Sequence, residues 1–135
     1  MDEYQCVVVD LAYYDNSKNI IVFVSEKDED FIIETTIDGI ELKSVGQGYF
    51  EVFQELRDKL LGLGYGLKCN GARINAIQSN MMGACEKIYL AEMEKPALNK
   101  DIVSIWDYAE INEFPNTEEQ QAFTNRWLNS IQAME

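Results

Sequence analysis

The chain has 135 residues, the length of one domain, and its composition of 47% hydrophobic and 26% charged residues is that of a folded globular protein. No run approaches the roughly 18 apolar residues of a membrane span, and the N-terminus is acidic where a secretory signal would be basic. The formal net charge of −13 disfavours nucleic acid as a partner, because such a surface repels phosphates. We therefore expect a single domain over residues 1–135 that binds neither a membrane nor nucleic acid.

The first third of the chain is predicted to form an antiparallel meander. Residues 4–14 and 19–26 are β-branched apolar runs on either side of the turn-type cluster DNSK, which predicts a hairpin. Residues 30–45 predict two more strands around Asp38-Gly39, a dipeptide that tolerates the positive φ angles of a two-residue turn.

The hydrophobic period then changes to that of a helix. Residues 48–64 predict an amphipathic helix, because their apolar side chains recur at spacings of three, four and seven, and Gly62 and Gly64 are natural stops. The apolar stripe consists of Tyr49, Val52, Phe53, Leu56, Leu60 and Leu63.

Three further strands and a second helix complete the prediction. The strands are expected at YGLKCNG (65–71), 87–93 and 101–109. A capping box of Thr117 and Gln120 predicts the start of the last helix, whose buried stripe would be Phe123, Trp127, Leu128 and Ile131. The expected fold is α+β, a largely antiparallel sheet of about seven strands with two amphipathic helices packed on it.

Histidine is absent from the sequence, which removes the Ser-His-Asp and Cys-His catalytic sets and the commonest metal ligand. The acidic residues 28–30 lack the spacing and glycine of a calcium loop, so no metal or cofactor is expected. An enzyme remains as an alternative built on CNGAR, with Cys69 or Arg73 in the site. The other interpretation is that Cys69 and Cys85 are small buried apolar residues.

The three cysteines form no CxxC pair, and an odd number of cysteines in a chain without an export signal indicates reduced thiols. We therefore expect a cytoplasmic protein.

Negative charge is concentrated at the two ends of the chain. Residues 1–43 carry a net charge of −8 and residues 101–135 carry −6, whereas residues 44–100 carry +1. Such a surface would attract a basic protein partner and speed the encounter. The alternative is that the excess of acidic residues only keeps the protein soluble.

The main predicted contact patch follows the last predicted strand. In WDYAEINEF (106–114), aromatic side chains alternate with carboxylates, which suits an interface facing Lys and Arg. The candidate residues are Asp107, Tyr108, Glu110 and Glu113. The alternative is that Trp106 belongs to the core and the acids after it form a solvated loop.

Two other segments could join a partner surface. Asp28, Glu29 and Asp30 lie between two predicted strands, where their charges prevent burial. Asn70 and Arg73 lie in a stretch, 67–87, that predicts a strand end, an Asn70-Gly71 turn and a polar loop.

The segment CNGAR…QSNMMG…KIYL…KPA…DIVSIWD (69–107) is similar to part of a group of small bacterial proteins, which implies a family but no activity. In size, acidity, α+β pattern and lack of a catalytic set, the whole chain resembles immunity proteins of bacterial toxin systems, such as contact-dependent inhibition. That resemblance implies a non-enzymatic cytoplasmic protein that binds a cognate nuclease toxin and blocks its active site or substrate groove. It assigns no individual residue.

Three other functions stay open beside an immunity protein. An acidic nucleic-acid mimic would use the same charge to inhibit DNA- or RNA-binding proteins. An enzyme would need a cysteine with a depressed pKa. An adaptor or structural subunit of a bacterial complex is the third possibility, and only the excess of acidic residues favours an immunity protein over it.

Overall fold

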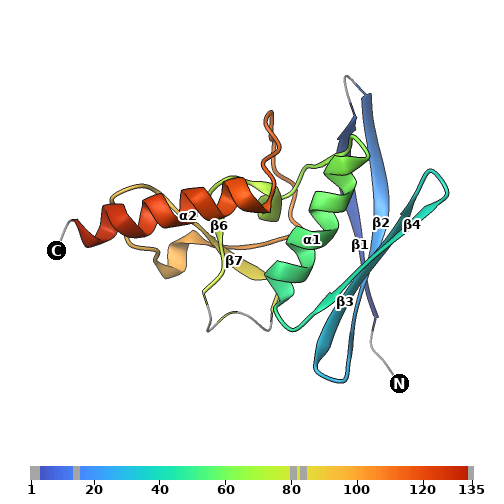
Figure 1. The fold of residues 1–135 in the computed structure, drawn as a ribbon, viewed down its shortest axis with the longest axis horizontal. Coiled ribbons are helices and arrows are strands. Elements are labelled where there is room, and N and C mark those ends of the chain that lie inside the picture. Colours follow the sequence, from blue (N-terminus) through green and yellow to red (C-terminus); the bar gives the residue numbers. More distant parts are fainter. Residues whose placement is uncertain (1–3, 14–15, 80–81, 83–84, 134–135) are drawn as a thin grey trace.

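A computed structural model describes residues 4–13, 16–79, 82 and 85–133 (Figure 1). It has two antiparallel sheets and two α-helices, which confirms the α+β prediction with eight strands in place of about seven. The larger sheet has the strand order β4-β3-β2-β1-β5, and the smaller sheet has the order β6-β7-β8.

The larger sheet is a meander extended by one short strand. Its strands are β1 (Tyr4–Tyr13), β2 (Asn16–Lys27), β3 (Asp30–Ile37), β4 (Ile40–Gly46) and β5 (Gly66–Leu67). The β3–β4 turn has positive φ at Asp38 and Gly39, as predicted. The β2–β3 turn has positive φ at both Asp28 and Glu29, the backbone of a type I′ turn built without glycine.

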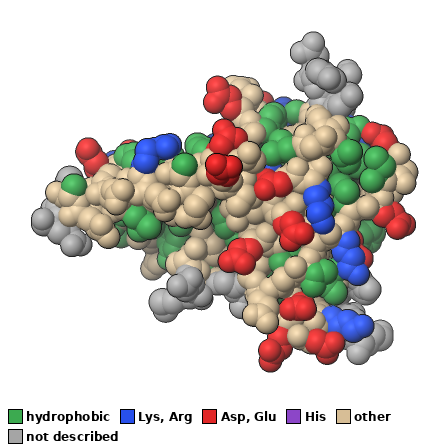
Figure 2. Space-filling model, viewed as in Figure 1, with side chains coloured by type: hydrophobic (Ala, Val, Ile, Leu, Met, Phe, Trp, Pro, Cys, Tyr) green, Lys and Arg blue, Asp and Glu red, His purple; other side chains and the backbone are tan. Residues whose placement is uncertain are grey.

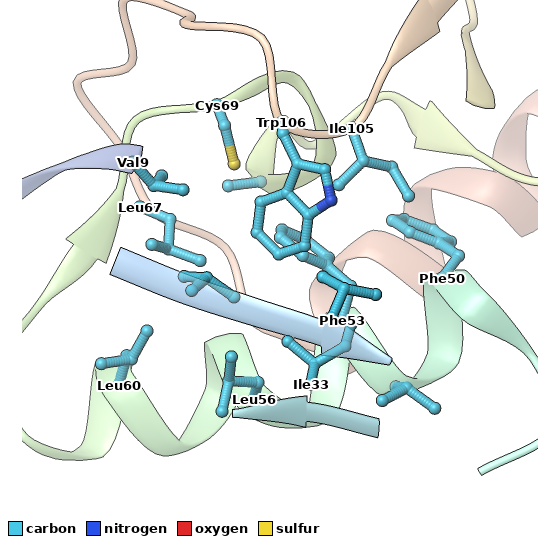
Figure 3. Close-up of a cluster of buried hydrophobic side chains, with 14 of the residues drawn as sticks. Val9, Ile33, Phe50, Phe53, Leu56, Leu60, Leu67, Cys69, Ile105 and Trp106 are labelled. Carbon is cyan, nitrogen blue, oxygen red and sulfur yellow. The ribbon is translucent and has the colours of Figure 1, made fainter. Parts of the chain in front are cut away.

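One face of this sheet forms the core with helix α1 (Tyr49–Gly62). Because side chains alternate along a strand, Val9, Ile33 and their neighbours in register point to the helix, which contributes Phe53, Leu56 and Leu60 (Figure 3). The predicted helix therefore begins and ends within two residues of the observed one, because its apolar stripe faces this sheet.

The smaller sheet consists of β6 (Ala76–Ile77), β7 (Lys87–Leu90) and β8 (Ile102–Ser104). Strand β6 was not predicted, and the strand predicted over 101–109 ends at Ser104. The chain turns at Ile105 and Trp106, and both side chains are buried. In a continuing strand, two successive side chains would point to opposite faces of the sheet. The 3₁₀ turn η1 (Asn70–Ala72) lies between β5 and β6, and the 3₁₀ turn η3 (Asn99–Asp101) lies between β7 and β8.

Helix α2 (Thr117–Gln132) lies beside the smaller sheet and extends away from the larger one (Figure 1). Its capping box is formed by Asn116 and Glu119, one residue before the predicted pair. Trp127 is buried and its indole N–H donates to the main-chain oxygen of Lys95 at 2.9 Å. Leu128, assigned to the buried stripe by the sequence, is exposed instead.

Candidate functional site

Main-chain hydrogen bonds hold residues 107–109 beside the residues that follow β5. Asn70 N donates to the oxygen of Asp107 at 2.9 Å, and Ala109 N donates to the oxygen of Lys68 at 3.2 Å. Cys69 and Tyr108 thus form an antiparallel bridge. The result is that Asp107 and Tyr108 are exposed on an ordered backbone, with 57% of Tyr108 accessible to solvent.

Three side chains interact on the surface next to this bridge. The hydroxyl of Tyr108 donates to the carboxylate of Glu110, and the ammonium of Lys68 lies 3.3 Å from the same group. The hydrogen bond from Tyr108, followed by Lys68, lowers the pKa of Glu110. The same hydrogen bond raises the pKa of Tyr108, so a carboxylate and a neutral phenol sit side by side.

Beyond Glu110 the chain forms one wall of a cavity of about 520 Å³, here called the acidic groove. It contains three carboxylates, from Glu110, Glu113 and Glu119, and one guanidinium, from Arg73. Figure 2 shows acidic side chains gathered on the loop before α2 and beside the start of that helix. The remaining lining residues are Ile74, Asn75, Ile111, Asn112, Phe114 and Pro115.

The carboxylate of Glu113 is the one most available to a partner. Glu110 is held by Lys68 and Tyr108, and Glu119 accepts a hydrogen bond from Asn116 N in the capping box. Within the described part of the chain, Glu113 makes no hydrogen bond or ion pair, and it is exposed.

A buried polar cluster joins the two walls of the acidic groove. The side-chain amide of Gln120, in the first turn of α2, donates to the main-chain oxygens of Gly71 at 2.9 Å and Arg73 at 2.7 Å. Its oxygen accepts from Arg57 Nη2 at 2.6 Å and from Gln54 at 3.0 Å. Gln120 thereby fixes the start of α2 against η1 and against α1.

Arg57 is fully buried, which is unusual for a charged residue. Burial lowers the pKa of its guanidinium, while the carboxylate of Asp58, 2.8 Å from Nε, opposes the shift. Asp58 also accepts from Thr117 N at 3.1 Å, so the same carboxylate serves the start of α2. The sequence interpretation missed this cluster, although Arg57 follows Phe53 by four residues and therefore lies on the apolar stripe.

Asn70 does not belong to the exposed contact surface predicted for it. It is only 8% exposed; its amide donates to the oxygen of Ser104 at 3.2 Å and accepts from Arg73 Nε at 3.1 Å. The side-chain amide of Asn70 is therefore hydrogen-bonded within the protein, where it orients Arg73 toward the groove. Arg73 itself is half-buried and lines that groove.

Cys69 is buried among Val9, Leu67 and Trp106 (Figure 3). Burial raises the pKa of its thiol to about 12, whereas a nucleophilic cysteine needs a depressed pKa. Cys69 therefore lacks the property on which the enzyme alternative depends. Trp106 is likewise a core residue, as the alternative interpretation of residues 106–114 expected.

The second predicted patch lies far from the acidic groove. Asp28 and Glu29 form the exposed β2–β3 turn, and Asp30 begins β3 half-buried. In Figure 1 this turn is at the bottom of the sheet, whereas the loop before α2 is at the top. A compact partner is therefore expected to contact either the groove or the β2–β3 turn, and substitutions can test the two patches separately.

Among the described residues, no three Cys, Asp or Glu side chains are grouped as metal ligands. Neither helix in the described part combines the length and hydropathy needed to cross a bilayer. No protein-family model matches the sequence, and a comparison with curated proteins finds no match.

Proposed function

We propose that this protein is a non-enzymatic immunity protein that binds and neutralises a cognate basic toxin domain, of the nuclease class, through the acidic groove. The observation that carries the proposal is the groove itself. It is a cavity of about 520 Å³ whose lining includes three carboxylates and one guanidinium.

The chemistry of the groove suits a protruding lysine or arginine of a partner. The carboxylate of Glu113 is exposed and without an intramolecular ion pair in the described part of the chain, so a guanidinium can pair with it in a bidentate manner. The exposed ring of Tyr108, held beside the groove by its bond to Glu110, adds a rigid aromatic contact of the kind enriched in binding hot spots.

The proposed partner follows from the sign of the charge. A nuclease groove is basic because its substrate is a polyanion, so an inhibitor with a carboxylate-lined surface matches its potential and associates quickly. The chain carries −13 overall, which attracts a basic partner, and three of its carboxylates line the groove.

The test is co-expression with a basic nuclease domain, sought first in the neighbouring reading frames, read as cell survival and as inhibition of nuclease activity in vitro. The wild-type protein is expected to protect cells, and Glu113→Lys is expected to weaken binding by about tenfold to a hundredfold by replacing an attraction with a repulsion. Association of the wild type should slow with added salt, and this dependence should flatten in the variant.

Glu29→Lys is the matched control, because it makes the same charge change at an exposed site in the β2–β3 turn, away from the loop before α2 (Figure 1). If Glu29→Lys abolishes protection and Glu113→Lys does not, the binding surface is the β2–β3 turn and the groove assignment is wrong. If the protein inhibits several unrelated basic proteins in competition with DNA, the acidic mimic replaces the immunity protein as the better account.

A further inference from the structure

The acidic groove contains a positive charge that is not neutralised by its carboxylates. Arg73 lines the groove together with Glu110, Glu113 and Glu119, yet within the described part of the chain it forms no ion pair. Its Nε donates to Asn70, which leaves the N–H groups of Nη1 and Nη2 without an acceptor among the described residues. The half-buried guanidinium of Arg73 is therefore available to a ligand.

Hydrogen bonds to the main chain and to the side chain fix the position of Arg73. Its main-chain N–H donates to the oxygen of Asn70 at 3.1 Å, and its main-chain oxygen accepts from Gln120 at 2.7 Å. Its Nε donates at 3.1 Å to the buried amide of Asn70, which is itself anchored on the oxygen of Ser104. Nη1 and Nη2 form a planar fork that can hold a carboxylate in a bidentate manner. Because the fork is already oriented, a ligand loses less of its binding free energy in ordering it.

The charges that the groove leaves free are of opposite sign. Glu110 and Glu119 already have hydrogen-bond partners in the protein. The charged side chains of the groove without a terminal partner in the described part of the chain are the carboxylate of Glu113 and the guanidinium of Arg73, and these two form no ion pair with each other. The groove therefore offers a ligand one negative site and one positive site.

A ligand that carries positive charge alone fits this arrangement poorly. Its lysine or arginine would pair with Glu113, but the same ligand would cover Arg73 and remove water from that guanidinium. A charge that loses water without gaining a counter-charge weakens binding, and a second cation beside it would be repelled. A carboxylate next to the ligand's cation would satisfy both sites, and the apolar lining at Phe114 and Pro115 would exclude water around the two pairs.

We infer that Arg73 binds a carboxylate of the partner, so that the groove recognises a protruding segment in which an acidic side chain accompanies the lysine or arginine held by Glu113. This inference rests on the proposed function and names the chemistry of the segment that the toxin domain presents. Arg73 is then the residue that determines specificity, because an unrelated basic protein supplies the cation without an acid in the matching place.

The test uses short peptides as probes, because they carry the required pair of charges without a toxin domain. One peptide contains a glutamate and an arginine separated by glycine spacers of increasing length, and in its counterpart a glutamine replaces the glutamate. Acetyl and amide caps remove the terminal charges of both. Binding is measured by nuclear magnetic resonance of the isotope-labelled full chain at low salt, with up to about 10 mM peptide. The resonances followed are Arg73 Nε–H and the main-chain amides of Asn112 and Glu113.

General attraction and the proposed site predict opposite preferences between the two peptides. A chain of −13 attracts the glutamine peptide, which is a cation, more strongly than the glutamate peptide, which is neutral. The proposed site is expected to bind the glutamate peptide more tightly, by about threefold to tenfold at the best spacer length. Tighter binding of the glutamine peptide at every spacer length would overturn the proposal, and so would the absence of any shift with both peptides.

Substitutions of Arg73 show whether it is the source of the preference. Arg73→Gln is expected to reverse the preference, whereas Arg73→Lys keeps the charge without the planar fork and should retain part of it. Arg126→Gln is the matched control, an exposed arginine on α2 outside the lining of the groove, and is expected to leave the preference unchanged. Circular dichroism verifies that the variants are folded. A folded Arg73→Gln variant that still prefers the glutamate peptide would overturn the proposal.

A third peptide, which lacks glutamate and ends in arginine with a free terminal carboxylate, identifies the source of the acid. If it binds more tightly than the glutamate peptide, the ligand is a chain end and the internal segment is wrong. The co-expression test is separate, because it compares Glu113→Lys with Glu29→Lys and leaves Arg73 in place. If Glu113→Lys abolishes protection while the peptides show no preference for glutamate, the role of Arg73 falls and the proposed function stands. If Glu113→Lys leaves protection intact while the peptides do show that preference, the ligand site stands and the proposed function falls.

Discussion

The indole N–H of Trp106 donates a 2.8 Å hydrogen bond to the phenol oxygen of Tyr49, and both side chains are buried. This bond ties the first turn of α1 to the end of the smaller sheet. Tyr49→Phe would leave the indole N–H without an acceptor, so we expect a loss of about 1–3 kcal/mol in the free energy of unfolding, measured by urea denaturation. Tyr108→Phe, which removes an exposed hydroxyl, should cost less than about 0.5 kcal/mol. Equal losses would contradict a buried role for the Tyr49 hydroxyl.

Tyr49 also gives the protein a characteristic response to alkaline pH. Burial raises the pKa of Tyr49 to about 12, above the value near 10 of an unfolded chain. The native state therefore holds this proton more tightly, so the stabilisation is complete below pH ~10 and is lost as the pH rises toward 12. The free energy of unfolding of the wild type should fall more steeply across that range than that of Tyr49→Phe. Parallel curves would show that Tyr49 titrates normally.

Gln120 is expected to be the most sensitive residue of the polar cluster beneath the groove. Gln120→Ala would remove the partner of two main-chain oxygens and leave the buried Arg57 without its closest acceptor. We expect a loss of about 3 kcal/mol or more. Gln121→Ala, next to it and exposed, should be nearly neutral. A loss below about 1 kcal/mol for Gln120→Ala would mean that the cluster contributes little to the fold.

Two glycines should respond to alanine in opposite directions. A Cβ at Gly71 would lie 2.7 Å from Ile105 Cγ2 and 2.8 Å from Phe53 Cε1, both in the core, so Gly71→Ala is expected to cost about 1–3 kcal/mol. A Cβ at Gly62, in the last turn of α1, meets no atom within 4 Å. Gly62→Ala should therefore stabilise the protein by about 0.5–1 kcal/mol, because it restricts the unfolded chain. Thermal unfolding of both variants checks the pair.

The cysteines should differ widely in reactivity. Cys69 is buried and its raised pKa keeps it protonated, so it should react with iodoacetamide at neutral pH only after denaturation. Cys6 is exposed and should react in the native protein. Mass spectrometry of the alkylated peptides separates the sites. Rapid alkylation of native Cys69 would revive the enzyme alternative.

The sequence predicts those parts of the fold in which a local pattern determines the structure. The Asp38-Gly39 turn and α1 are such cases, because a turn dipeptide and an apolar stripe act within a few residues. Strand β6 and the early end of β8 are not determined by a local pattern. There the burial of Ile105 and Trp106 against α1 overrides the alternation, and this depends on partners far along the chain.

The candidate site is predicted in part for the same reason. Glu110 and Glu113 stand out as acids beside aromatic residues, and both line the acidic groove. Their meeting with Arg73 depends on the bridge between Cys69 and Tyr108, which spans nearly forty residues. Asn70 carries the same polar signal as a binding residue, but its hydrogen bonds lie within the fold.

The short strand β5 has a consequence for the order in which the protein becomes functional during its synthesis. The meander β1–β4 joins neighbouring segments, and contacts of that kind form early. The groove has one wall from residues 73–75 and the other from residues 110–119, which meet only when the chain after β5 pairs with Tyr108. If the groove binds a partner as proposed, a nascent chain is therefore expected to bind it only after the start of α2 has left the ribosome. Removal of α2 by proteolysis is accordingly expected to abolish the proposed binding, because Glu119 and the anchoring Gln120 would be lost with it.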